Sequence, residues 1–159
     1  IKYTEGVSMK LYTLHTKILV PIDLESCFSF FNSPRNLEKL TPKNLSFKIL
    51  TPGEITMQTG TCIDYQVIVS GIPTRWTSLI QDYEPPHRFT DVQLKGPYSF
   101  WHHEHSFHTQ EGGTLVEDKV HYGLPLGILG RFGHSLFIKK QLQGIFDYRK
   151  KVLVDLFKP

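Results

Sequence analysis

The chain has 159 residues, of which 40% are hydrophobic and 21% are charged. This length and composition are typical of one folded globular domain and argue against a disordered chain. No apolar run approaches the roughly 18 to 20 residues that span a bilayer, which excludes an integral membrane segment. The formal net charge of +3 comes from residues 131–158, where seven basic residues accompany two acidic ones. We interpret this segment as a solvated helix face, with an acidic partner as the alternative, and expect no nucleic-acid partner.

The cysteines and the first residues of the chain indicate the cellular compartment of the protein. Cys27 and Cys62 have neither metal-binding spacing nor a disulfide-rich pattern, so we expect two small buried hydrophobic residues in a reducing compartment. The chain begins with IKYTEGVS, which is polar and does not resemble a secretory signal. We therefore expect a cytoplasmic protein in which Met9 is the natural start and residues 1–8 are an upstream tail or a cloning remnant.

The first third of the chain predicts one strand and two short helices. Residues 10–20 alternate between two faces, as in a strand, and Pro21 ends the pattern. Asp23 predicts the N-cap of a short helix. The apolar stripe of this helix consists of residues at helical spacing: Leu24, Cys27, Phe28 and Phe31. Ser33 and Pro34 predict the start of a second short helix that runs to about residue 40.

The rest of the chain predicts a sheet followed by one long helix. Six more segments are alternating or β-branched and are separated by turn residues: 45–50, 61–69, 74–83, 88–94, 99–109 and 114–122. With no helices between them, these strands must pair in antiparallel fashion. A helical period then continues to the C-terminus for about 25 residues, or roughly 37 Å. We predict an α+β fold in which a seven-stranded antiparallel sheet curves around this helix and leaves a cavity between them.

Strand alternation indicates which side chains face the cavity. In 99–109, Trp101, His103, His105 and Phe107 share the more apolar face. If 110–113 form the turn, His105 lies opposite Asp118 on the next strand. Applied to the other strands and the long helix, the same argument predicts these lining residues: Trp76, Ser78, Phe89, Asp91, Gln93, Trp101, His103, His105, Phe107, Asp118, Tyr122 and Phe146. An apolar wall with a few convergent polar groups is typical of a small-molecule pocket.

Several of these segments resemble a known family. They include residues 84–93 (EPPHRFTDVQ), the pattern Trp101-x-His103-x-His105-x-Phe107, and the stretch from Asp118 to Gly127. Together they resemble the SRPBCC superfamily of START-like or pollen-allergen-like helix-grip proteins, especially the bacterial polyketide-cyclase/dehydrase-like and ligand-binding branch. The resemblance covers the chain from Met9 onward and implies a single START-like helix-grip domain, residues 9–159, with a deep cavity under the long helix. It implies no particular activity, because members of one fold carry out many functions.

The two inward histidines allow three interpretations. His103, His105 and Asp118 have the composition of a metal site with an open position. Asp118 and the histidines also fit a buried polar network that has only a structural role. In the third interpretation, a histidine oriented by Asp118 contacts a ligand or acts as an acid or base. We expect no metal and no cofactor, and the sequence contains no glycine-rich phosphate loop.

The leading functional hypothesis is binding of a hydrophobic or amphipathic small molecule, such as a lipid, isoprenoid, quinone or polyketide. Aromatic side chains would provide affinity, and the polar lining residues would orient a head group. One alternative is a cyclase, dehydratase or hydrolase that uses His105 and Asp118 as an acid–base pair. The other is a regulatory module that binds a partner through the basic C-terminal helix. The apolar, glycine-rich loop 123–133 is a candidate gate at the cavity mouth.

Overall fold

The computed structural model of the protein describes residues 9–69, 71–125 and 131–158. The expected tail, residues 1–8, and residues 126–130 of the candidate gate loop lie outside these ranges. In chain order the elements are β1 (Leu11–Val20), α1 (Leu24–Phe31), α2 (Pro34–Lys39), a 3-10 turn (Lys43–Leu45), β2 (Lys48–Ile49), β3 (Cys62–Val69), β4 (Ile72–Glu84), β5 (Arg88–Lys95), β6 (Phe100–Gln110), β7 (Gly113–Gly123) and α3 (Arg131–Leu156).

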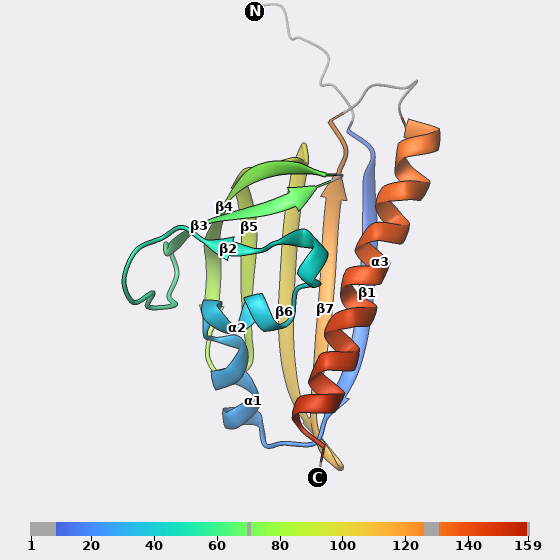
Figure 1. The fold of residues 1–159 in the computed structure, drawn as a ribbon. Coiled ribbons are helices and arrows are strands. Elements are labelled where there is room, and N and C mark those ends of the chain that lie inside the picture. The colour runs from blue at the N-terminus through green and yellow to red at the C-terminus, as the bar shows by residue number, and fades with distance from the viewer. Residues whose placement is uncertain (1–8, 70, 126–130, 159) are drawn as a thin grey trace, which may run out of the picture.

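The seven strands form one antiparallel sheet in the order β1-β7-β6-β5-β4-β3-β2. The first strand therefore pairs with the last, and the short β2 forms the opposite edge. The sheet curves around α3, which runs alongside β1, while α1 lies against β6 and β7 (Figure 1). This arrangement confirms the predicted α+β helix-grip architecture.

The register of β6 and β7 positions the two inward histidines. His105 lies opposite Asp118, as the sequence predicts, and His103 lies opposite Val120. Gly113 begins β7 at a φ of +146°, and a Cβ at this position would lie 2.1 Å from the backbone oxygen of the last β1 residue. Glycine is therefore required here, because the backbone at the end of β1 passes directly beside it.

Some boundaries differ from the predicted ones. The segment 45–50 pairs only through Lys48–Ile49, because the preceding 3-10 turn ends at Ser46, which has a left-handed φ of +43°. Strand β4 begins two residues earlier than predicted, and the turn between β6 and β7 contains two residues instead of four. None of these differences changes which residues of β6 and β7 face inward.

Helix α1 closes one end of the core. Asp23 caps it as predicted, since its carboxylate accepts the backbone N–H of Ser26 at 2.9 Å. On the buried face, Phe28 and Phe31 meet Phe107 of β6 edge to face, with ring centroids 5.3 and 5.2 Å apart. Phe107 is completely buried by these contacts, so it holds α1 on the sheet.

The two cysteines lie in different environments. Cys27 is completely buried in α1, as predicted. Cys62 is exposed, and the prediction of a buried residue is wrong there. It is the first residue of β3, and strand alternation turns Ile63 inward and Cys62 outward. The thiol therefore reaches solvent.

Helix α3 packs its apolar stripe on the sheet. Leu142, Phe146 and Leu153 are buried, and Arg149 occupies the same stripe with only 8% of its surface exposed. The lysines of this helix are exposed, which agrees with a solvated face. The interpretation of the basic residues as solvated is wrong for Arg149. Among the residues that the structure describes, no helix is long and apolar enough to cross a membrane.

Candidate functional site

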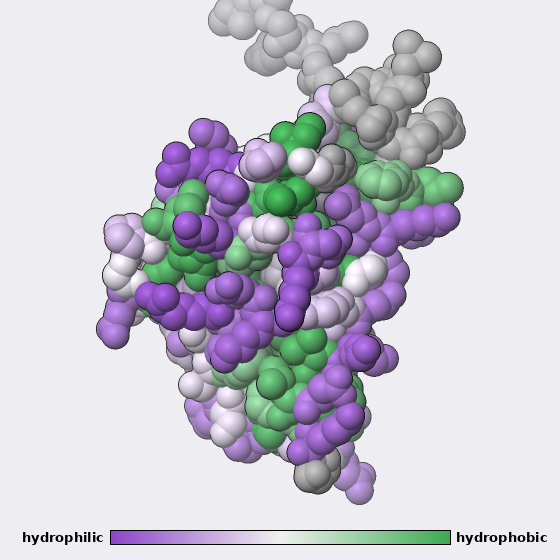
Figure 2. Space-filling model, in the orientation of Figure 1, coloured by the Kyte–Doolittle hydropathy of each residue, from purple (hydrophilic) through white to green (hydrophobic). Residues whose placement is uncertain are grey.

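A cavity of about 200 Å³ lies between the inner face of the sheet and helices α1, α2 and α3. Its walls come from β2 to β6 on one side and from α3 on the other. Phe30, Leu37 and Ile145 line the cavity and are only partly buried, which places its mouth between the short helices and α3. Figure 2 shows hydrophobic side chains reaching the surface between these helices, below a hydrophilic band.

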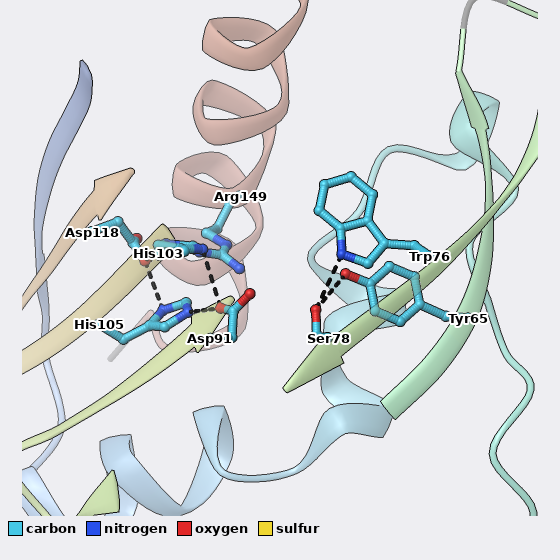
Figure 3. A network of polar contacts seen from close by, with 8 residues as sticks. All are labelled: Tyr65, Trp76, Ser78, Asp91, His103, His105, Asp118 and Arg149. Atoms are coloured by element: carbon cyan, nitrogen blue, oxygen red, sulfur yellow. Dashed lines mark hydrogen bonds and ion pairs between the residues drawn. The ribbon is translucent and has the colours of Figure 1, made fainter. Parts of the chain in front are cut away.

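Five ionisable side chains form one connected cluster at this cavity (Figure 3). Asp118 Oδ1 lies 2.9 Å from His103 Nε2, 2.8 Å from His105 Nδ1 and 3.0 Å from Arg149 Nη1. The contact with His105 Nδ1 is too poorly aligned for a hydrogen bond. Asp91 Oδ2 lies 3.1 Å from His105 Nε2 and 3.5 Å from His103 Nδ1. Each imidazole is therefore placed between two carboxylates.

The environment shifts the pKa values of this cluster in different directions. Burial and the neighbouring His105 lower the pKa of His103. Burial also acts to lower the pKa of His105, but contacts with Asp118 and Asp91 outweigh it and raise the pKa. For Asp118, burial acts to raise the pKa, but Arg149 and the two histidines hold it well below the usual value. Both carboxylates are therefore favoured in the ionised form, and His105 binds a proton more readily than His103.

A second polar cluster lies across the cavity, on β3 and β4. Trp76 Nε1 donates a hydrogen bond to Ser78 Oγ at 3.2 Å, and Tyr65 Oη lies 3.1 Å from the same oxygen. Tyr65 and Trp76 stack with ring centroids 5.7 Å apart. Burial raises the pKa of Tyr65 well above its ordinary value, so the phenol stays protonated. The two clusters face each other in Figure 3, and both line the cavity.

The structure brings eight of the twelve predicted lining residues to the cavity wall: Trp76, Ser78, Phe89, Asp91, Trp101, His103, His105 and Phe146. The other four lie outside the lining. Gln93 bonds the backbone of Tyr98 through both ends of its amide, and Phe107 packs on α1. Asp118 lies behind the two histidines, and Tyr122 stacks on Tyr12 of β1. These four residues support the wall from behind.

Two features of the site were not predicted from the sequence. The interpretation of residues 131–158 as a solvated face includes Arg149, although its spacing of three residues from Phe146 is that of the apolar stripe. Strand alternation predicts that Asp91 faces inward, but it does not pair this residue with the histidines. The register of β5 and β6, which puts Asp91 opposite His103, provides this pairing.

Comparisons with known proteins identify the fold. No family model matches the chain, and no curated protein is significantly similar to it in sequence. The structure of the Zhui aromatase/cyclase from Streptomyces sp. R1128 is similar, with a TM-score of 0.74 and 14% identity over 94% of each chain. Ginseng major latex-like protein 151 from Panax ginseng has a TM-score of 0.67 and 12% identity, covering 94% of this chain and 99% of that one.

A third similar structure is that of Ara h 8.0201, with a TM-score of 0.61 and 14% identity, covering 92% of this chain and 99% of that one. At these identities the likeness concerns the fold. It agrees with the strand order and the position of α3 described above. The chain therefore shares the helix-grip fold of these structures, which is the fold that the sequence resemblance implied.

Proposed function

We propose that the protein binds a hydrophobic or amphipathic small molecule in the cavity between the sheet and α3. The observation that supports this function is a cavity of about 200 Å³ with aromatic and aliphatic walls and a polar cluster on either side. An engineered apolar cavity of about 150 Å³ holds one benzene molecule, so a bicyclic ring system is a suitable size for a ligand. A ligand in this cavity would gain affinity mainly from apolar burial.

The polar groups would orient such a ligand. Asp91 is the most exposed member of the five-residue cluster, with 16% of its side chain accessible, and it lines the cavity. A ligand hydroxyl can donate a hydrogen bond to this carboxylate, or a ligand oxygen on the other side of the cavity can accept one from Tyr65 or Ser78. We therefore favour a flat apolar molecule with at least one hydroxyl or carbonyl group over a purely hydrocarbon ligand.

Isothermal titration calorimetry with 2-naphthol tests the proposal. At about −0.5 kcal/mol for each of its 11 non-hydrogen atoms, this probe would bind with a Kd of about 0.1 mM. Val67→Phe adds a ring to the cavity wall and should weaken binding about tenfold or more. Val92→Phe is the matched control, because Val92 lies on β5 opposite the outward His102.

Saturable one-site binding that is lost in Val67→Phe and kept in Val92→Phe would support the proposal. Equal binding by both variants would contradict it, because the probe would then lie elsewhere. Absence of heat with 2-naphthol, together with absence of any co-purifying ligand in native mass spectrometry, would also contradict it.

A reaction in the cavity is the second candidate function. It is favoured by the position of His105 and Asp91, which contact each other and line the cavity. One of the similar structures is that of an aromatase/cyclase. The candidate predicts that His105→Gln abolishes turnover of a bound substrate while 2-naphthol binding is retained. Unchanged turnover in this variant would exclude an acid–base role for His105.

We also infer that residues 9–159 act as one ligand-binding domain in the cytoplasm. Support for this location comes from the exposed free thiol of Cys62, since exposed cysteines persist in reducing compartments. Trapping thiols in intact cells with an alkylating reagent tests it. A fully alkylated Cys62 is expected, and recovery of the protein mainly as a Cys62-linked disulfide would contradict a reducing location.

A further inference from the structure

Asp91, His103 and His105 lie on the neighbouring strands β5 and β6 and face the same cavity. We propose that these three side chains bind a divalent transition-metal ion, with Zn²⁺ as the ion that fits best, in the wall of the cavity. Two imidazoles and one carboxylate are a common ligand set for zinc with an open coordination position. This inference does not depend on the proposed ligand-binding function.

The distances between the ligand atoms suit such an ion. Asp91 Oδ2 lies 3.1 Å from His105 Nε2 and 3.5 Å from His103 Nδ1. The three atoms all lie within 4.8 Å of one another. Zinc bonds of about 2.0 to 2.1 Å in a tetrahedron separate neighbouring ligand atoms by about 3.3 Å. The two separations from Asp91 are therefore within a few tenths of an ångström of the zinc value, and rotation of the imidazole rings would adjust the third.

The groups behind the histidines are those that zinc sites use. Metal-bound histidines usually direct their second ring nitrogen to a carboxylate, which fixes the ring and its tautomer. Asp118 provides this carboxylate for His103, with a hydrogen bond of 2.9 Å to Nε2, and it lies 2.8 Å from His105 Nδ1 without the alignment of a hydrogen bond. Arg149 in turn holds Asp118 at 3.0 Å. Both imidazoles thus present their remaining nitrogen toward Asp91.

Charge and accessibility favour a cation at this position. The fixed charges of the cluster are those of two aspartates and Arg149, and they sum to −1 in the metal-bound form, because a histidine that binds a metal ion is neutral. All three proposed ligands line the cavity, whereas Asp118 does not. A bound ion would therefore have its open coordination position toward the cavity, where a water molecule or a ligand oxygen could occupy it.

The first arm of the test uses the unmodified protein. After treatment with a chelator and gel filtration, the protein is titrated with Zn²⁺ by calorimetry and with Co²⁺ by visible absorption. We expect one tight equivalent of Zn²⁺ and intense Co²⁺ bands of the four- or five-coordinate type. Zn²⁺ should also raise the midpoint of thermal unfolding, because the ion binds the folded state preferentially. Weak octahedral Co²⁺ spectra, together with no tight equivalent of Zn²⁺, would overturn the proposal.

The second arm removes single ligands. Asp91→Asn and His103→Gln should each weaken Zn²⁺ binding about 100-fold or more. His102→Gln is the matched control, because it removes an imidazole from the same strand but on the opposite face. Zinc binding that survives in both ligand variants and is lost in His102→Gln would overturn the proposal and identify an adventitious surface site.

The third arm of the test needs no variant, so it decides for or against the zinc site even if the variants do not fold. Crystals of the unmodified protein soaked in Zn²⁺ are measured on both sides of the zinc absorption edge. We expect an anomalous peak within bonding distance of Asp91, His103 and His105. Anomalous peaks at surface histidines alone, with no peak between these three side chains, would overturn the proposal.

Discussion

The pairing of Arg149 with Asp118 gives the sharpest stability prediction. Asp118 has only 2% of its surface exposed, and Arg149 reaches it from α3, 3.0 Å away. Arg149→Met removes the guanidinium but keeps an unbranched chain of similar length beside the ring of Phe146, which the guanidinium carbon overlies at 5.2 Å. The substitution therefore tests the charge pair with little loss of packing.

The expected cost follows from the burial of the pair. Removing one partner of a buried ion pair costs about 3 to 5 kcal/mol, because it leaves an uncompensated charge. Asp118 retains its contacts with His103 and His105, so we expect the lower end, about 3 kcal/mol. For a chain of this length, that loss corresponds to a decrease in Tm of about 6 to 12 °C.

Urea unfolding followed by tryptophan fluorescence measures the change. Arg75→Met is the matched control, since Arg75 is exposed and lies 3.9 Å from Asp64, and it should cost less than about 1 kcal/mol. The double variant Arg149→Met/Asp118→Asn should be at least about 1 kcal/mol more stable than the sum of the single effects predicts. Equal costs for Arg149→Met and Arg75→Met would refute the buried pair.

Three further predictions concern other parts of the fold. Phe107→Ala should cost about 3 to 5 kcal/mol in urea unfolding, because the ring is completely buried against α1. Cys62 should react with a thiol-specific chromogenic disulfide in the native protein, whereas Cys27 should react only on unfolding, since burial raises its pKa to about 12. Asp23→Ala should destabilise the protein above about pH 4. This effect should shrink as the pH falls through the folded-state pKa of Asp23, which its bond from the α1 backbone lowers.

For each of these three predictions, one result would contradict it. A cost below about 1 kcal/mol for Phe107→Ala would mean that α1 is not held by this ring. Two thiols that react at the same rate in the native protein would contradict the burial of Cys27. A destabilisation by Asp23→Ala that stays constant from pH 7 to pH 3 would show that the capping bond to the α1 backbone is not the cause.

The register of β6 and β7 could be predicted from the sequence because both strands alternate cleanly and the turn between them is short. Once Thr109 and Thr114 pair, every inward residue follows, including His103, His105 and Asp118. The predicted turn of four residues is two residues longer than the observed one. The register is the same, because β6 and β7 each extend by one residue into the predicted turn.

The remaining parts of the site depend on tertiary packing. Side chains lean along a strand, so His103 reaches Asp118 although Val120 lies directly opposite it. The contacts between Asp91 and the histidines cross from β5 to β6, and the turn residues at 96–97 do not by themselves fix the register of these two strands. Arg149 meets Asp118 because of the way α3 packs on the inner face of the sheet. Alternation within one strand contains no information on these contacts.

A crystal structure of the protein with 2-naphthol tests the proposed ligand-binding cavity most directly. The account predicts that the ring system lies between the sheet and α3, in contact with Trp76 and Phe146, with its hydroxyl oxygen within hydrogen-bond distance of Asp91, Tyr65 or Ser78. Density for the probe only on the outer surface, with side chains filling the cavity, would contradict the account.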